Sequence, residues 1–292
     1  MKLLNLQRRI RFHLAGRLGN QLFEWAFAHR ALEQETKCIQ FTTDRFHHPR
    51  GLAEYELERL ECEHILAPKV ANLFGMVLAV LDKLGGKAKP LVQFLAPKLI
   101  REIDQQTSSI IISEKTNYIS GFFIDKNYVE AVEEVVTLEI CNTLSKIFDK
   151  SWSDELPKDY EVLHIRKGDF SLHQETYGIL TNEYYCEIQK SDLPLIVVTE
   201  LASESRELID LLKPYMVYDS TNSSAWDSLA IMSHAKILHL SNSTLSWWAG
   251  VAGKGFGHKV TIPTPFYKTL SIEESNLKFL LHGFETRQST FA

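Results

Sequence analysis

The sequence predicts an α/β protein built on mainly parallel sheets, and two observations predict this class. Short apolar runs alternate with stretches in which apolar residues recur at helical spacing, most regularly in the second half of the chain. Three of the apolar runs also end in turns rich in glycine, hydroxyl, amide or charged residues. Strands that alternate with helices imply a parallel, doubly wound sheet. Ligands of such sheets bind beyond the carboxyl ends of the strands.

The first half alternates less regularly. Its expected strands are 10–15, 38–43, 110–112 and 117–123, and its expected helices are 20–35, 70–84, 90–101 and 128–148. The polar segment 149–158, which contains Pro157, is the expected linker. The expected domains are therefore residues 1–150 and 151–292.

The second half predicts a regular succession of elements. Its expected strands are 160–165, 195–199, 216–218, 236–241 and 260–262. Its expected helices are 181–190, 203–212 with Ser203 as the N-cap, 224–234, 245–251 and 271–282.

Three of the strand-to-turn junctions carry recognisable patterns. Residues 16–21 have the form G-x-x-G-N-Q, residues 164–169 the form H-x-R-x-G-D, and residues 242–248 the form N-S-T-x-S-W-W. Ser, Asn and Thr are good helix N-caps. The exposed N–H groups at a helix N-terminus favour anions such as phosphate. The third junction, between a strand and a helix, therefore favours an anion site.

In this order, the three junctions resemble the bacterial α-1,2-fucosyltransferases of glycosyltransferase family 11, and they span most of the chain. The resemblance implies a GT-B architecture, with two Rossmann-like domains and the ligand in the cleft between them. It implies an inverting, metal-independent galactoside 2-α-L-fucosyltransferase that transfers L-fucose from GDP-β-L-fucose to the 2-hydroxyl of a terminal galactose. The N-terminal domain would face the acceptor, an oligosaccharide or lipid-linked glycan, and the C-terminal domain would bind GDP-fucose.

Such an enzyme must stabilise a diphosphate leaving group, either with a metal held by an Asp-x-Asp pair or with a fixed cation. The chain contains no Asp-x-Asp. Arg166 is the expected catalytic cation, because guanidinium is always charged and grips phosphate with two parallel hydrogen bonds. His164 would share its face of the strand and either contact phosphate, position Arg166 or serve as a structural group. Asp169 would orient Arg166 or the loop; a surface Arg166–Asp169 pair is the alternative to catalysis.

The remaining expected site residues follow from the motifs and the resemblance. Gly16 and Gly19 would allow close backbone approach, and Asn20 would cap the following helix. Core packing is expected for at least one of Trp247 and Trp248, with sugar stacking open for the other. The expected residues that bind GDP-fucose are Arg17, Leu18, Gly19, Asn20, His164, Arg166, Asp227, Asn242, Ser243 and Thr244.

Several assignments stay open at this stage. Glu200 stands where the resemblance suggests an acidic pair and could contact ribose or guanine. The general base is open among Asp125, Glu24 and Asp169. The alternative functions are fucose transfer in another linkage or to a protein hydroxyl, and a non-catalytic nucleotide-sugar or glycan-binding protein.

Composition excludes several other classes. A net charge of −5 argues against a general nucleic-acid binder. The four cysteines form no C-x-x-C pair, so neither a zinc site nor a disulfide scaffold is indicated, and we expect no metal or cofactor. The sequence shows no signal peptide, and its longest apolar run, 70–81, is shorter than the roughly 20 residues that span a bilayer. We expect a cytoplasmic protein, with peripheral inner-membrane contact through the basic residues Lys83, Lys87 and Lys89 left open.

Overall fold

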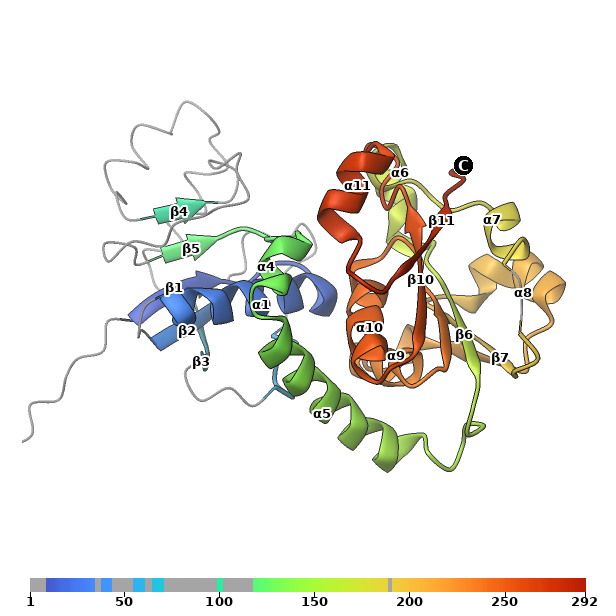
Figure 1. Cartoon of the computed structure of the whole chain (residues 1–292), viewed down its shortest axis with the longest axis horizontal. Helices are drawn as coiled ribbons and strands as arrows, with labels where there is room; N and C mark the ends of the chain where they lie inside the picture. The colour runs from blue at the N-terminus through green and yellow to red at the C-terminus, as the bar shows by residue number, and fades with distance from the viewer. Residues whose placement is uncertain are drawn as a thin grey trace, which may run out of the picture. The chain divides into compact units, whose positions relative to one another are not determined.

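The computed structural model describes residues 9–34, 38–43, 55–60, 65–70, 99–101, 118–188 and 191–292. The chain divides into two compact units, residues 1–136 and 137–292 (Figure 1). The division falls inside helix α5 (Glu133–Ser151), and the expected domain boundary after residue 150 lies at the end of the same helix. The two units are described separately.

Unit 1 contains a parallel five-stranded sheet in the order β3-β2-β1-β5-β4. Its strands are β1 (Arg9–His13), β2 (Cys38–Thr43), β3 (Ile65–Val70), β4 (Leu99–Arg101) and β5 (Tyr118–Ser120), and its helices include α1 (Leu18–Gln34) and α4 (Lys126–Glu130). The buried ring of Phe12 on β1 lies 5.4–5.9 Å, between ring centroids, from Phe27, Phe41 and Phe123. Edge-to-face aromatic packing therefore joins β1 to α1, β2 and the segment after β5.

Two expected helices of unit 1 are wrong where the structure describes them. Val70 ends strand β3, and residues 99–101 form β4, which pairs in register with β5. A short apolar run in a sequence is compatible with either a buried strand or part of a helix. Pairing with neighbouring strands, which the sequence does not show, decides between the two. The remainder of these expected helices, with Lys83, Lys87 and Lys89, and the expected strand 110–112 lie outside the described residues.

Unit 2 is built on a parallel six-stranded sheet in the order β8-β7-β6-β9-β10-β11. Its strands are β6 (Glu161–Ile165), β7 (Leu195–Thr199), β8 (Met216–Asp219), β9 (Ile237–His239), β10 (Lys259–Thr264) and β11 (Glu285–Gln288). The first five were expected and β11 was not. When the six strands are numbered 1 to 6 in chain order, their order in the sheet is 3-2-1-4-5-6, the doubly wound arrangement. The topological switch point of this arrangement lies between β6 and β9.

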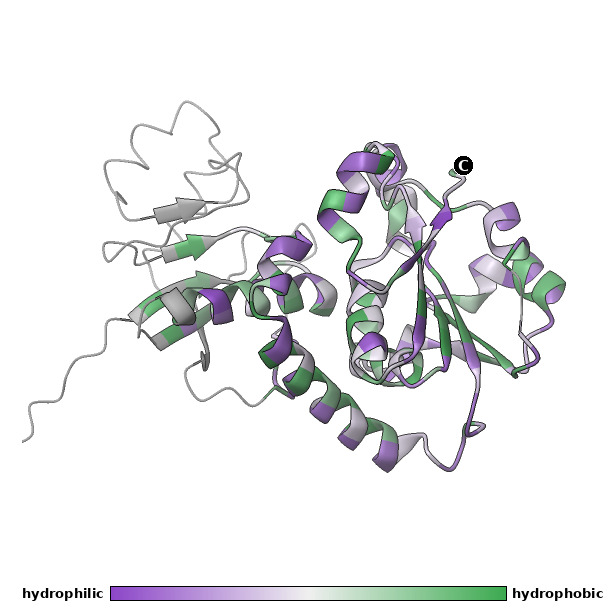
Figure 2. Ribbon diagram, viewed as in Figure 1, coloured by the Kyte–Doolittle hydropathy of each residue, from purple (hydrophilic) through white to green (hydrophobic). Residues whose placement is uncertain are grey.

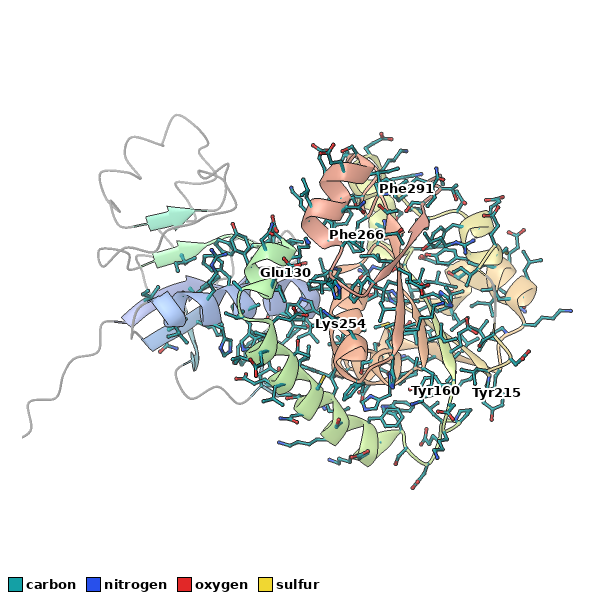
Figure 3. The ribbon with its side chains drawn as sticks, in the orientation of Figure 1. Glu130, Tyr160, Tyr215, Lys254, Phe266 and Phe291 are labelled. Carbon is teal, nitrogen blue, oxygen red and sulfur yellow. The ribbon has the colours of Figure 1, made fainter. Side chains whose placement is uncertain are left out.

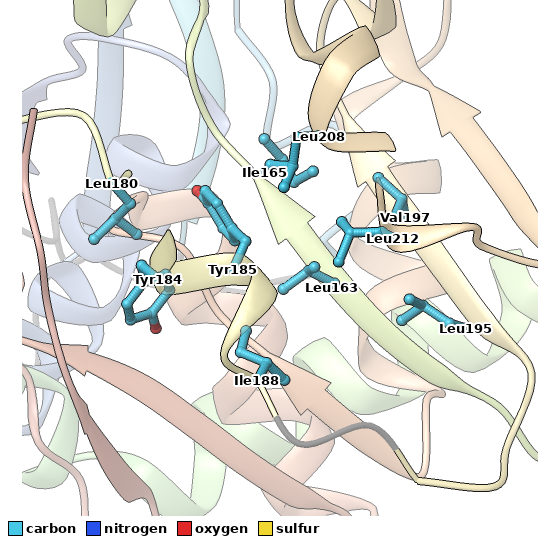
Figure 4. Close-up of a cluster of buried hydrophobic side chains, with 10 residues drawn as sticks. All are labelled: Leu163, Ile165, Leu180, Tyr184, Tyr185, Ile188, Leu195, Val197, Leu208 and Leu212. Atoms are coloured by element: carbon cyan, nitrogen blue, oxygen red, sulfur yellow. The ribbon is translucent and has the colours of Figure 1, made fainter. Parts of the chain in front are cut away.

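The centre of the unit 2 sheet is buried on both faces. All five residues of β6 and of β7 are buried, which is typical of parallel strands covered by helices on both sides. Figure 4 shows Leu163 and Ile165 of β6 and Val197 of β7 packing against side chains of α7 (Asn182–Cys186) and α8 (Arg206–Leu212). In Figure 2 both strands carry green, the hydrophobic colour, and β6 also carries purple. Tyr160, labelled in Figure 3, precedes β6 and donates its hydroxyl to the carbonyl of Ile231 at 2.7 Å.

Two helices of unit 2 begin at serine residues that cap them. Ser224 caps α9 (Ala225–Ser233), and Ser271 forms a capping box with Glu274 at the start of α11 (Ile272–Phe279). The expectation that Ser203 caps a helix is wrong. The backbone of Leu201 is left-handed, with φ 65°, and leads into the 3-10 turn η4 (Ala202–Ser205), so that α8 begins only at Arg206.

Both tryptophans of the third motif belong to the core. Trp247 and Trp248 lie in α10 (Thr244–Gly255), and each is 0% exposed. The indole Nε1 of Trp247 donates to the carbonyl of Phe279 at 2.8 Å, which joins α10 to α11. Neither ring is available to stack on a sugar, so that alternative is wrong. Among the described residues, no helix is both long and apolar enough to cross a membrane.

We predict that Trp247→Phe lowers the free energy of unfolding by about 1–3 kcal/mol, because the buried Phe279 carbonyl loses its donor. Urea denaturation measures the change. The matched control is Leu277→Ala on α11, whose side chain is 61% exposed and which should alter stability much less. Equal effects of the two substitutions would contradict the structural role of the indole N–H.

Candidate functional site

The candidate site lies at the carboxyl ends of β6 and β9, on either side of the topological switch point. Arg166 follows β6, and residues 240–243 connect β9 to α10. His164 Nδ1 and Ser241 Oγ are 2.7 Å apart, so a buried hydrogen bond joins the end of β6 to the turn after β9. The structure therefore brings the second and third sequence motifs together at the edge where α/β sheets bind ligands.

His164 is neutral in this setting. It is 4% exposed, and burial lowers its pKa to about 3, with the charge of Arg166 acting in the same direction. A neutral imidazole adds no positive charge to a bound phosphate. Its role at the switch point is to exchange a hydrogen bond with Ser241, and this fixes the turn that begins α10.

Arg166 is held by groups that the sequence did not single out as its partners. Its Nη1 donates to a carboxylate oxygen of Glu200, which follows β7. Its guanidinium carbon lies 5.3 Å from the ring centroid of Phe170 in η3 (Gly168–His173), a cation–π arrangement. The expected pair of Arg166 with Asp169 stays a prediction, and the structure adds the pair with Glu200. The side chain of Asp169 itself lies outside what the structure describes.

The turn after β9 combines a rigid backbone with a helix N-terminus. Ser246 Oγ donates to the carbonyls of Ser241 and Ser243 at 3.0 Å. Ser243 is the N-cap of α10, but its side chain makes no capping hydrogen bond. The hydroxyl therefore does not occupy the first-turn N–H groups, which is the arrangement suited to an incoming anion. Thr244, also expected to bind the donor, opens the first turn of α10.

Asn242 has a structural role that the sequence did not reveal. Its buried amide nitrogen donates to the carbonyls of Tyr177 and Gly178, at 3.1 and 3.0 Å. These contacts tie the segment after η3 to the turn before α10. The carbonyl Oδ1 of Asn242 is buried and has no hydrogen-bond partner within the described part of the chain. Of the two polar atoms of this amide, Oδ1 is the one that could accept a hydrogen bond from a ligand.

Asp227 lies elsewhere at the sheet. It sits in the first turn of α9, and its Oδ1 accepts from the indole Nε1 of Trp152 at 3.3 Å. Its charge also acts on Tyr218 of the edge strand β8. The structure therefore places Asp227 near the β8 edge, two strands from β6, and does not bring it into contact with Arg166.

The first motif belongs to unit 1 and forms a tight turn. Gly16 has φ +74°, and a Cβ at this position would collide with the amide of Asn20. The carbonyl of Arg17 accepts from the N–H groups of Asn20 and Gln21, so α1 begins at Leu18. Asn20 is thus inside the first turn, and the expectation that it caps the helix is wrong. Gly19 is buried and the side chain of Arg17 is exposed.

Two candidates for the general base have structural contacts. Both carboxylate oxygens of Glu24, which is 0% exposed, accept from the backbone N–H of Ala15 at 3.1 Å. Asp125 caps α4 by accepting from the N–H of Asn127 at 2.9 Å. Both carboxylates therefore stabilise turns of unit 1, and their assignment as a base stays a prediction.

A hollow of about 360 Å³ opens at the opposite, amino edge of the unit 2 sheet. Its lining residues are Ser145, Phe148, Lys158, His234, Lys236, Phe256 and His258. His234 and His258 donate through Nδ1 to carbonyls of Ala230 and Ser233 near the end of α9. Basic side chains at a helix C-terminus neutralise its partial negative charge. The two histidines therefore serve as hydrogen-bond donors to the end of α9, and the switch point remains the candidate site. Within the described residues, no group of three or more His, Cys, Asp or Glu side chains is placed to hold a metal.

We predict that unit 2 loses stability as the pH falls below 6.5. His164 has a folded pKa of about 3 against an ordinary value of 6.5, so the unfolded state binds more protons between these values. The free energy of unfolding should fall with pH by at most about 1.4 kcal/mol per unit from this histidine. Burial also lowers the pKa of His234 and of His258, which adds to the same trend.

The measurement is urea denaturation between pH 7 and pH 5, followed by tryptophan fluorescence. His164→Asn keeps a nitrogen near Ser241 but cannot take up a proton, so its stability should depend less steeply on pH. An identical slope for wild type and variant would show that His164 is not held neutral by the fold.

Comparison with known proteins identifies the fold. No family model matches the chain, and no curated protein matches it by sequence. A glycosyl transferase of family 9 from Veillonella parvula is 10% identical with a TM-score of 0.52, over 98% of this chain and 88% of its own. The fucosyltransferase NodZ from Bradyrhizobium is 11% identical (TM-score 0.48; 84% of this chain and 93% of its own). POFUT1 in complex with GDP is 13% identical (TM-score 0.46; 86% of this chain and 95% of its own).

These comparisons confirm the α/β class and the GT-B type of fold, with Rossmann-like parallel sheets. They contradict the assignment to the bacterial α-1,2-fucosyltransferase family, glycosyltransferase family 11. The similar structure with a TM-score of 0.52 is a glycosyl transferase of family 9, and no family model supports the assignment to family 11.

Proposed function

We propose that this chain is an inverting glycosyltransferase that uses GDP-β-L-fucose as its donor. One observation carries the proposal: Arg166 follows β6 at the topological switch point, and the N-terminus of α10 follows β9 across it. A fixed cation and a helix N-terminus are two groups that bind a diphosphate well. The choice of guanine and fucose rests on the three sequence motifs.

The reaction needs charge stabilisation where the donor breaks. The acceptor hydroxyl attacks the anomeric carbon of fucose as the bond to the β-phosphate oxygen breaks, and negative charge grows on GDP. Arg166 and the first-turn N–H groups of α10 would stabilise that charge, which increases toward the transition state. Neutral His164 would hold Ser241 and with it the turn, and would not compete with Arg166 as a second cation.

The finer part of the proposal is the linkage, namely transfer to the 2-hydroxyl of a terminal galactose on an oligosaccharide or lipid-linked glycan. It rests on residues 242–248, whose pattern first suggested this linkage. The test is incubation with GDP-fucose and a panel of β-galactosides, with the product linkage read by NMR. A product linked at another hydroxyl would revise the linkage alone. Binding of GDP-fucose without turnover on any acceptor would favour a non-catalytic sugar-nucleotide-binding protein.

We predict that activity survives chelation of divalent metals. The proposed cation is Arg166, and the sequence contains no Asp-x-Asp pair. Turnover after dialysis against EDTA should stay within about twofold of the untreated enzyme, since a fixed arginine needs no metal to bind diphosphate. Complete loss that manganese or magnesium restores would assign the charge stabilisation to a metal.

We predict that Arg166→Lys lowers kcat by about two to three orders of magnitude, with a much smaller change in the KM for GDP-fucose. Lysine keeps the charge but loses the planar pair of donors, so stabilisation of the developing charge is lost. Arg206→Lys at the start of α8 is the matched control, since Arg206 is exposed. A folded Arg166→Lys enzyme with near-normal kcat would remove Arg166 from the mechanism.

A further inference from the structure

Glu200 and Arg166 occupy equivalent positions on neighbouring strands. In the ladder between β6 and β7, Ile165 pairs with Thr199, so the next residue on each strand is Arg166 and Glu200. Parallel strands in register bring such residues to the same height at the carboxyl edge. The ion pair between Arg166 and Glu200 is thus a direct consequence of the strand register.

The surroundings restrain this ion pair. The side chains of Arg166 and Glu200 are only 12% and 26% exposed, so bulk water screens them less than a surface pair. Phe170 lies against the guanidinium, and the turn at Gly168 runs beside the carboxylate. A Cβ built on Gly168 would lie 3.5 Å from Glu200 Oε2, at ordinary van der Waals distance. Glu200 and Phe170 therefore restrict the guanidinium from two directions.

An unrestrained arginine is a poor catalytic cation. Its long side chain has many rotamers, and ordering it at the moment of reaction costs conformational entropy. A donor that is fixed before the substrate arrives avoids that cost, which is the advantage of a preorganised site. A guanidinium carries five N–H donors, and the carboxylate of Glu200 takes up Nη1. The pair therefore engages one terminal nitrogen of the fork and can orient the whole planar guanidinium.

We propose that Glu200 is a positioning residue, whose carboxylate holds Arg166 in the orientation that meets the donor diphosphate. The inference rests on the proposed function for its catalytic consequence. The positioning role is an alternative to the interpretation, suggested by the sequence, that Glu200 contacts ribose or guanine. An acid at the end of the second strand of a doubly wound sheet can also bind ribose hydroxyls directly. The two roles predict different results.

The first experiment needs no substrate. The Nε–H signal of Arg166 in ¹⁵N NMR, assigned by its loss in Arg166→Lys, reports how well the guanidinium is ordered. Glu200→Gln keeps a carbonyl oxygen that accepts from Nη1, so the signal should resemble that of the wild type. Glu200→Ala removes the acceptor, and the signal should broaden or exchange away. An equally ordered signal in Glu200→Ala would overturn the proposal whatever the donor proves to be.

The second experiment is a double-substitution cycle with kinetics. In the wild-type background, Glu200→Ala should lower kcat by about 10- to 100-fold with a change in KM below about threefold, whereas Glu200→Gln should stay within about threefold. In the Arg166→Lys background, Glu200→Ala should change kcat by less than about twofold, because its effect passes through the arginine. Glu204→Gln, an exposed carboxylate of η4, is the matched control and should retain wild-type kinetics.

The outcomes separate the two proposals. A wild-type protein that shows no transfer from GDP-fucose counts against the proposed function, and the NMR comparison still decides the role of Glu200. A rise in KM alone, or an equal effect of Glu200→Ala in both backgrounds, would assign Glu200 to direct substrate contact and overturn the positioning role. Unchanged kcat in Glu200→Ala would overturn it as well.

Discussion

The pairing of β6 with β7 on one side and β9 on the other is the constraint on which the candidate site depends. Because all three strands are parallel, the residues that follow them emerge at one edge of the sheet. Arg166, Glu200 and Ser241 each follow one of these strands at that edge, although up to 75 positions separate them in the numbering of the chain. The buried apolar strands hold the register, and the register brings the polar residues together.

The three polar side chains His164, Arg166 and Glu200 at this edge differ in charge. His164 is deeply buried, and burial lowers its pKa so far that it remains neutral beside Arg166. Arg166 keeps its charge because guanidinium does not deprotonate in proteins, and Glu200 supplies a partly shielded carboxylate. A neutral hydrogen-bonding group and an oriented cation are thus placed side by side. The arrangement avoids two adjacent buried positive charges, which would raise the cost of folding.

The sequence predicts most of unit 2 because apolar runs and helical spacing are local signals. The register of one strand against another is not local, which explains why Glu200 was not recognised as the partner of Arg166. In unit 1 the same limit led to helices at positions where β3 and β4 pair with neighbouring strands. The capping prediction for Asn20 failed because α1 begins directly after Arg17. The carbonyl of Arg17 accepts the first N–H groups of the helix, and Asn20 therefore lies inside the first turn.

The motif residues also show why a strong sequence pattern did not establish the family. Asn242 holds the backbone at Tyr177 and Gly178, Trp247 and Trp248 fill the core, and Gln21 closes the turn by donating to Gly16. In this chain, the packing of the two turns explains these roles without a bound sugar nucleotide. Evidence for the reaction must therefore come from experiments on Arg166 and on the first turn of α10.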